Sequence, residues 1–350
     1  MSSPTVPIQF VHRALHTVAR AGVDVNVLLR GTGVSPDLVV NRRARVTVEQ
    51  VTVLTQRLWQ LTGDELFGAG EQPVPRGTFR LLTLAMIHSP DLRTVLRRFD
   101  EFTDVLPNVP SLTVTAGPDS TRLQIDISGL DDPEHLVTDF ALAVGHRFTS
   151  WLIGKRIKLS AVELPYPAPP EAADYDRVFG TMPTFDSAWA ALTFDSALLA
   201  APVVRDENDL VGYLNNSPGD LLSRRDYGST LADQVRRILE YALDATEAGT
   251  ATTRAPAPPP WPTPEEVAAR LVLSVQHLRR KLREEGTSMS QIREEILRDA
   301  AIASLARGQE PVTELAARLG FSEPSAFRRA FRRWTGSPPG SYRPERPAER

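Results

Sequence analysis

The stretch that decides the fold is AARLGFSEPSAFRRAFRRWTGSPPGSYR, residues 316–343. Its first residues predict a short helix that ends at Gly320, because glycine readily adopts the backbone of a tight turn between two helices. Phe327 and Phe331 lie four residues apart, which predicts a second helix with one apolar side. The opposite side of that helix carries Ser325, Arg328, Arg329, Arg332 and Arg333. Such a face is typical of a recognition helix, which offers donors to phosphates and base edges in the major groove.

The same pattern occurs once earlier in the chain. Residues 267–271 (VAARL) match residues 315–319 (LAARL) at a spacing of 48 residues, and a serine and a second helix follow each copy. In the first copy, Leu278 and Leu282 form the apolar pair. The exposed side of that helix then carries Gln276, Arg279, Arg280 and Arg283. A repeat of this kind also suits a helical scaffold without DNA, but the two arginine-rich faces favour a tandem helix-turn-helix.

Local signals fix the ends of these helices. The sequence Thr263-Pro264-Glu265-Glu266 is a capping box with proline at the first helical position, so a helix begins there. Ser274 and Ser322 are predicted to cap the second helix of each pair through their hydroxyls. Residues 290–305 are predicted to form the helix that connects the two copies.

On these motifs, residues 263–343 resemble the DNA-binding domain of the AraC/XylS family of transcription regulators, most densely over 316–343. The resemblance implies two recognition helices in successive major grooves, with Arg280 and Arg329 as the foremost contacts. The first copy departs from the family at Val272, where glycine is usual. We expect strain there if the turn needs a positive φ, because a β-branched residue disfavours that region.

The preceding half of the chain mixes two periodicities. Strand-like alternation covers residues 111–115, 122–127 and 157–164. Helical spacing covers residues 11–29, 48–61, 77–88, 92–105, 135–152 and 230–245. The expected fold class is therefore an α+β N-terminal domain followed by an all-α tandem helix-turn-helix domain.

Residues 20–205 resemble the arabinose-binding-like sensing domain that accompanies part of this family. The residues that carry the resemblance are LLRGTGVSPDLV (28–39), PRGTFRLLTLAMIHSPDLRTVLRRFDEFTDVL (75–106) and LTFDSALLAAP (192–202). The resemblance implies a small-molecule effector. We single out Arg76, Phe79 and Met86 as candidate ligand-binding residues. Further apolar and aromatic candidates are Leu82, Phe99, Phe102, Phe140, Phe148 and Trp151, which suit a hydrophobic effector but equally suit a simple core.

Composition sets the domain limits. Residues 249–262 (GTATTRAPAPPPWP) are typical of an extended spacer. The predicted order is a sensing domain (1–205), a helix and Pro-rich linker (206–262), the double helix-turn-helix (263–343) and a tail (344–350). Residues 263–350 hold 16 basic against 12 acidic residues, while the whole chain has a net charge of -3. A basic end on an acidic body suits nucleic-acid binding.

Several classes of function lose support. The chain has no cysteine, which removes thiolate metal sites and cysteine nucleophiles. No phosphate-binding glycine loop and no Gly-x-Ser-x-Gly elbow occurs. His12 and His16 have metal-ligand spacing but no third ligand nearby. We therefore expect no enzyme activity, no metal and no cofactor, and the lack of a signal peptide or membrane span indicates the cytoplasm.

The interpretation is a transcription regulator controlled by an effector, with activation as the expected outcome and repression as the alternative. Its expected partners are promoter DNA, the effector, RNA polymerase and a second copy of the chain, which would dimerise through residues 136–153 or 230–245. The alternatives are an architectural DNA-binding protein without an effector, and an enzyme fused to a DNA-binding tail.

Overall fold

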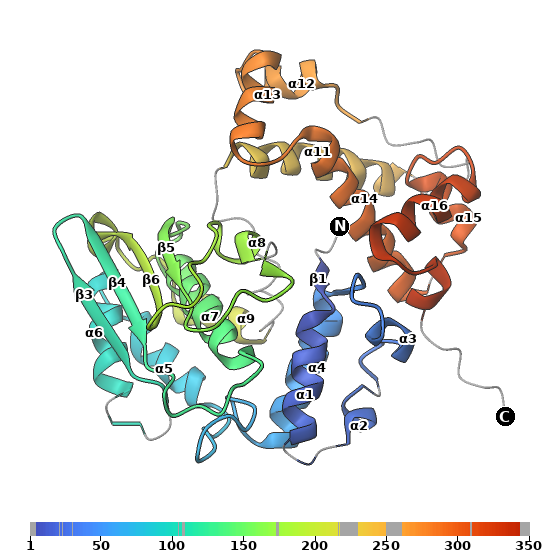
Figure 1. Cartoon of the computed structure of the whole chain (residues 1–350). Helices are drawn as coiled ribbons and strands as arrows, with labels where there is room; N and C mark the ends of the chain where they lie inside the picture. The colour runs from blue at the N-terminus through green and yellow to red at the C-terminus, as the bar shows by residue number, and fades with distance from the viewer. Residues whose placement is uncertain are drawn as a thin grey trace. The chain divides into compact units, whose positions relative to one another are not determined.

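The computed structural model describes residues 5–20, 22, 24–29, 31–103, 105–106, 109–172, 175–215, 217, 230–249, 261–308 and 310–343. The chain divides into two compact units. The mixed unit comprises residues 9–28 and 52–227, and the helical unit comprises residues 1–8, 29–51 and 228–350. Figure 1 shows the elements of both. Among the described residues, no helix has the length and apolar character needed to cross a membrane.

The mixed unit is built largely from helices. They are α1 (Gln9–Arg20), α2 (Val25–Leu29), α4 (Val48–Thr62), α5 (Thr78–Ile87), α6 (Leu92–Thr103), α7 (Leu136–Leu152), α8 (Tyr175–Phe179), α9 (Glu207–Asn215) and the 3-10 helix η2 (Ser196–Ala200). The expected single helix over residues 11–29 is wrong. It is divided into α1 and α2, because Gly22 takes a φ of 75° that no right-handed helix allows.

One four-stranded antiparallel sheet completes this unit. Its strands are β3 (Leu112–Ala116), β4 (Ser120–Ile125), β5 (Leu159–Glu163) and β6 (Ala190–Asp195), in the order β3-β4-β6-β5. Leu123 of β4 stands opposite Val114 on one side and Leu192 on the other. Three of these strands match the alternation in the sequence, whereas β6 was not predicted as a strand.

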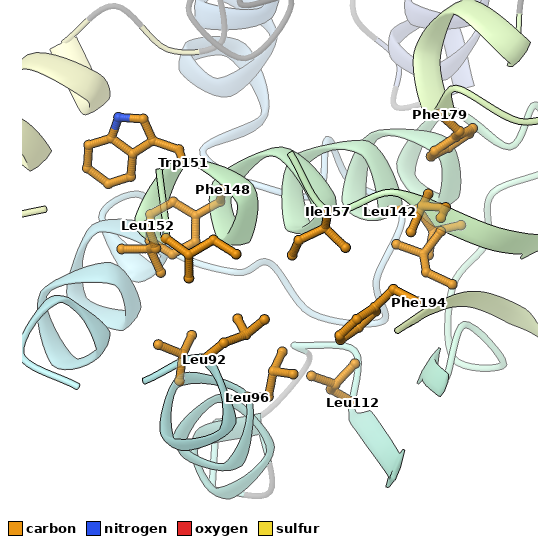
Figure 2. Close-up of a cluster of buried hydrophobic side chains, with 14 of the residues drawn as sticks. Leu92, Leu96, Leu112, Leu142, Phe148, Trp151, Leu152, Ile157, Phe179 and Phe194 are labelled. Atoms are coloured by element: carbon orange, nitrogen blue, oxygen red, sulfur yellow. The ribbon is translucent and has the colours of Figure 1, made fainter. Parts of the chain in front are cut away.

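The core of the mixed unit lies between the sheet and its helices. Helix α6 contacts β3, and α7 contacts β6. Figure 2 shows part of the buried cluster, in which Leu152 and Phe148 of α7 lie toward Leu92 and Leu96 of α6, and Phe194 of β6 lies toward Leu112. Burying this apolar surface is what holds the helices on the sheet.

The helical unit is assembled around α14 (Met289–Arg307). Its other elements are β1 (Thr5–Pro7), β2 (Arg45–Thr47), α3 (Pro36–Val39), α11 (Leu231–Gly249), α12 (Pro264–Arg270), α13 (Val275–Glu284), α15 (Val312–Arg318), α16 (Pro324–Thr335) and the 3-10 helix η3 (Pro339–Tyr342). Helix α14 contacts α11, α15, α16, η3, β1 and β2. Ten of its residues are buried, four of them alanine or serine, and these small side chains let neighbours approach closely.

The first strands of the chain belong to this helical unit. β1 pairs antiparallel with β2, with Val6 opposite Val46, and both strands contact α14. Residues 1–8 and 29–51 therefore fold with the C-terminal helices. The sequence placed them with the sensing residues, because nothing in a three-residue strand shows which distant helix will cover it.

Candidate nucleic-acid interface and effector cavity

The first helix-turn-helix is formed by α12 and α13. Thr263 caps α12 in a complete capping box with Glu266, as predicted from the sequence. Ser274 caps α13 by accepting a hydrogen bond from the backbone N–H of His277 at 3.2 Å. Leu278 and Leu282 are buried, so the opposite side of α13 is turned outward.

The turn between these helices contains a strained residue. Val272 has a φ of 57°, and its side chain is 91% exposed. The neighbouring backbone requires this turn, since the N–H of Leu273 donates to the carbonyl of Ala268 at 2.9 Å. The expected conflict between a β-branched side chain and a positive φ is thus present.

The outward side of α13 carries all four residues singled out from the sequence. They are exposed: Gln276, Arg279, Arg280 and Arg283. Arg280 forms an ion pair of 2.6 Å with Glu284 one turn later. Both partners are about half-exposed, so this pair contributes little and can yield to a stronger anion.

The second helix-turn-helix is formed by α15 and α16. Gly320 in its turn has a φ of 85°, and the N–H of Phe321 donates to the carbonyl of Ala316 at 2.9 Å. The predicted cap by Ser322 is wrong. Glu323 is the N-cap of α16, without a side-chain hydrogen bond, because Pro324 takes the first helical position.

An aromatic cluster fixes the orientation of α16. Phe327 and Phe331 are fully buried, and the ring of Phe331 packs edge-on against Tyr342 of η3 at 5.1 Å between centroids. Phe321 meets Phe327 edge-on at 5.4 Å. The exposed side of α16 then presents Ser325, Arg328, Arg329 and Arg332. Those three arginines have no ion-pair partner among the described residues.

Arg333 differs from its neighbours on α16. Its guanidinium pairs with Glu294 of α14 at 2.6 Å, and the indole N–H of Trp334 donates to the same carboxylate. These hydrogen bonds hold the pKa of Glu294 below its usual value. Arg333 therefore links α16 to α14, and the exposed positive charge of α16 that has no ion-pair partner lies on Arg328, Arg329 and Arg332.

Helix α11 supports the first motif. It contacts both α13 and α14, and Val235, Leu239 and Leu243 on its apolar side are buried. The carboxylate of Glu285, just after α13, accepts the first two backbone N–H groups of α11 at 3.0 and 2.8 Å. The sequence predicts this helix as part of the linker, because the Pro-rich residues that follow it indicate the start of a separate DNA-binding domain. Of the predicted helix and linker (206–262), residues 216, 218–229 and 250–260 lie outside the described part of the chain, as does the predicted tail (344–350).

The N-terminal segment supports the second motif. Thr5 of β1 donates to the buried carboxylate of Asp299 on α14 at 2.7 Å. Asn41 donates to the carbonyl of Thr335 at the end of α16 at 2.9 Å, and the N–H of Arg45 donates to the Tyr342 hydroxyl at 3.2 Å. These partners lie nearly 300 residues apart in sequence, so no local pattern could have predicted them.

The mixed unit contains a cavity of about 580 Å³. Its walls come from α5, α6, α7, α9 and strands β3, β4 and β6, and are mostly apolar. Of the residues suggested from the sequence, it is lined by Arg76, Phe79, Leu82, Met86, Phe99, Phe140 and Phe148. Phe102 and Trp151 are not among the lining residues; Trp151 is a core residue stacked on Tyr213 at 4.4 Å.

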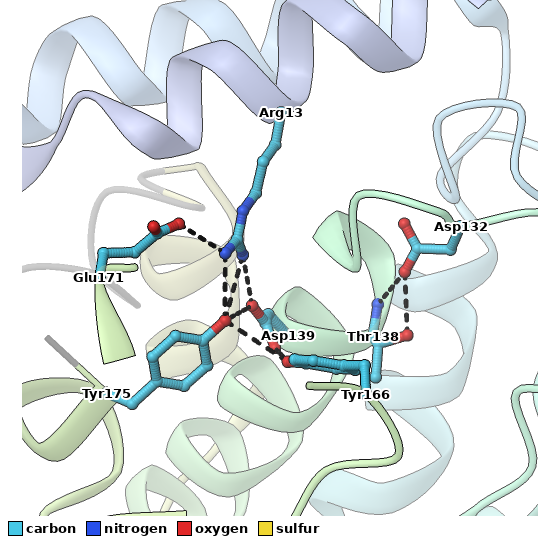
Figure 3. A network of polar contacts seen from close by, with 7 residues as sticks. All are labelled: Arg13, Asp132, Thr138, Asp139, Tyr166, Glu171 and Tyr175. Atoms are coloured by element: carbon cyan, nitrogen blue, oxygen red, sulfur yellow. Dashed lines mark hydrogen bonds and ion pairs between the residues drawn. The ribbon is translucent and has the colours of Figure 1, made fainter. Parts of the chain in front are cut away.

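A buried polar network anchors the cavity wall. Arg13 of α1 forms ion pairs with Asp139 of α7 at 2.6 Å and with Glu171 at 2.8 Å (Figure 3). The hydroxyls of Tyr166 and Tyr175 donate to the same Asp139 carboxylate. Burial raises the pKa of Asp139, and the Arg13 charge opposes that rise. The network ties α1 to α7, and sequence analysis missed it because its members come from separate elements.

The histidine pair suggested by spacing consists of His12 and His16. His16 lies 3.2 Å from Glu134, and no group of three or more His, Cys, Asp or Glu side chains suited to a metal ion is found in the described ranges.

Comparison with known proteins gives two family matches. The family model described as the arabinose-binding domain of AraC transcription regulator, N-terminal, matches residues 22–203, and a helix-turn-helix domain model matches residues 267–345. The chain is similar to the ornithine utilization regulator of Pseudomonas aeruginosa, with 26% identity over 97% of this chain and 96% of that protein. It is 36% identical to the regulator VqsM of the same species over 25% of this chain and 26% of that one. Among solved structures, CdpR of P. aeruginosa aligns over 95% of this chain and 97% of its own, with 20% identity and a TM-score of 0.30.

Proposed function

Since the chain belongs to the AraC family of transcription regulators, we propose that it docks on promoter DNA through α13 and α16 and that its effector binds in the cavity of the mixed unit. Its action as an effector-controlled DNA-binding regulator follows from the family. We further propose that binding of the chain activates transcription through RNA polymerase and that the protein works in the cytoplasm.

The observation that carries the DNA interface is the shared exposure of two arginine-bearing helices, each preceded by the same turn. The residues proposed to contact DNA are Gln276, Arg279, Arg280, Arg283, Ser325, Arg328, Arg329 and Arg332, and all are exposed. Arginine in the major groove can pair bidentately with guanine, and its neighbours can contact phosphates. The proposed DNA-binding region takes residues 263–343 together with α11, whose contacts with α13 and α14 support its inclusion.

A random-library selection with the purified full chain tests this interface. We expect an enriched site with two halves about one duplex turn apart. Arg280→Ala should weaken one half and Arg329→Ala the other, each by about 5- to 150-fold, the loss typical of a good base contact. Arg93→Ala, which removes an exposed arginine of α6, is the matched control and should change nothing. Selection of no site would overturn the proposed function.

Effector identity can be approached through the relatives. The name of one relative refers to ornithine utilization, so L-ornithine is the effector to compare with the cavity lining. A cationic amino acid needs free carboxylates, yet the carboxylate of Glu65 at the cavity already accepts the N–H groups of Gly77 and Phe79 at 2.6 and 2.8 Å. The mostly apolar lining therefore favours an apolar effector over a cationic amino acid. Repeating the selection with L-ornithine should leave affinity unchanged.

A dimer of this chain would have to form through surfaces that are exposed in the single chain. In one chain the apolar side of α11 is buried, so a dimer contact on residues 230–245 would have to use its exposed side, where Tyr241 is 73% exposed. Much of α7 is likewise buried. We therefore expect one chain to span the bipartite site. Analytical ultracentrifugation with and without DNA would measure the stoichiometry, and in vitro transcription would test activation.

A further inference from the structure

We infer that the cavity of the mixed unit binds a single-chain amphiphile, with its hydrocarbon chain inside and an anionic headgroup against Arg76 and Arg80. This inference rests on the proposed function only in treating the cavity as the effector site. The binding itself is measured without DNA.

The inner wall of the cavity offers hydrocarbon and almost no free polar group. Met86, Leu96, Leu112 and Phe148 are buried lining residues. The buried hydroxyls at the wall are engaged within their own segments, because Thr83, Thr149 and Ser217 donate to the carbonyls of Arg80, Gly145 and Tyr213 at 2.9, 2.7 and 2.8 Å. A sugar or an amino acid buried here would leave several of its own polar groups without partners, at a large cost in affinity.

The volume suits one chain. At about 30 Å³ for each water-sized group, a cavity of about 580 Å³ has room for roughly 20 groups the size of a methylene. That is enough for one hydrocarbon chain of medium length with its headgroup, and it falls within the range of ligand sites in proteins.

The charges at the cavity select an anion. Arg76 and Arg80 line it and are exposed, and among the described residues neither guanidinium group has a hydrogen-bond or ion-pair partner. The only carboxylate in the described lining is Glu65, which is already engaged by two backbone N–H groups. Two guanidinium groups against one carboxylate leave a positive balance. A carboxylate on the ligand neutralises this excess positive charge, whereas a cationic headgroup is repelled.

Gly145 of α7 leaves open space at the cavity wall. It lines the cavity, and a Cβ built on it would meet no atom within 4 Å. Its backbone is helical, so any side chain can be placed there without backbone strain, and replacing a helical glycine favours the helix. A large side chain at this position therefore reduces the cavity without threatening the fold.

Calorimetric titration of the full chain with three ten-carbon probes tests the inference: decanoate and decyltrimethylammonium, each below its micelle concentration, and decan-1-ol below its solubility limit. We expect one site that binds decanoate tightest and the cation weakest. Affinity along the series of carboxylates from six carbons upward should rise about fourfold per methylene until the chain fills the cavity, and then stop. Equal binding of the three probes, or none, would overturn the inference.

Two sets of variants locate the site. Arg76→Gln with Arg80→Gln should weaken decanoate about two- to fivefold for each arginine and leave decan-1-ol unchanged. Gly145→Leu should weaken decanoate and decan-1-ol together, while Gly145→Ala, the matched control, should bind as the parent chain does. Decanoate binding untouched by Gly145→Leu would place the ligand elsewhere and refute the assignment. A bipartite DNA site without decanoate binding would leave the proposed function intact, and decanoate binding without a DNA site would do the reverse.

Discussion

Replacing Val272 with glycine should stabilise the first helix-turn-helix. Val272 has a φ of 57° in the turn between α12 and α13. Holding a residue with a Cβ in that region costs about 1–2 kcal/mol. Glycine removes this strain but adds about 0.5–1 kcal/mol of unfolded-state entropy. The side chain is 91% exposed, so little packing is lost. The net expectation for Val272→Gly is about 0.5–1 kcal/mol in favour of the folded turn.

Hydrogen exchange of the backbone amides in α12 and α13 measures this directly in the full chain. A gain of about 0.5–1 kcal/mol slows exchange by about two- to fivefold if these helices open locally. Gly320→Val is the matched control, because Gly320 has a φ of 85° at the corresponding turn. It should speed exchange in α15 and α16. Faster exchange in α12 and α13 after Val272→Gly would refute the argument from strain.

Three further changes test other contacts. Thr5→Val leaves the buried Asp299 carboxylate without its 2.7 Å donor and should lower the free energy of unfolding by about 1–3 kcal/mol in urea, whereas Thr5→Ser should not. Burial lowers the pKa of His146 from 6.5 to about 4. The neutral form is therefore favoured in the folded state, and stability should fall by up to about 3 kcal/mol as the pH drops from about 6.5 to about 4, a slope that His146→Gln should lack. Glu285→Ala removes the acceptor for the first two N–H groups of α11 and should cost about 1 kcal/mol in thermal unfolding, with Glu285→Gln between it and the parent because its amide keeps one acceptor oxygen; a Glu285→Ala chain as stable as the parent would contradict a capping role.

The two helix-turn-helix motifs could be predicted because their signals are local. A capping box at Thr263, paired apolar residues four apart and a glycine at position 320 each act within a few residues of themselves. The turn strain at Val272 was also predictable, since φ is constrained by the residue's own Cβ. The prediction that failed in these motifs concerns the residue at which a helix begins. Ser322 lost the cap to Glu323 because Pro324 fixes the first helical position one residue later.

The candidate effector site was harder to predict. Seven suggested residues do line the cavity, but the same helical spacing placed Trp151 in the core, because periodicity tells which side of a helix is apolar and not whether a neighbour fills the space beside it. The open space beside Gly145 depends on which elements face α7, and the engagement of Glu65 depends on how its loop meets the start of α5. Neither feature can be predicted from the local sequence.

The sequence by itself determined the tandem repeat, the helix ends and the arginine-rich faces of α13 and α16, because period, caps and charge are properties of neighbouring residues. Only the tertiary structure decided that β1 and β2 join the helical unit, that Thr5 contacts Asp299, and that Arg13 of α1 pairs with Asp139 of α7. These contacts join residues 126 to 294 positions apart. Their free energy comes from burial and pairing that exist only once the chain has folded, so no single segment can encode them.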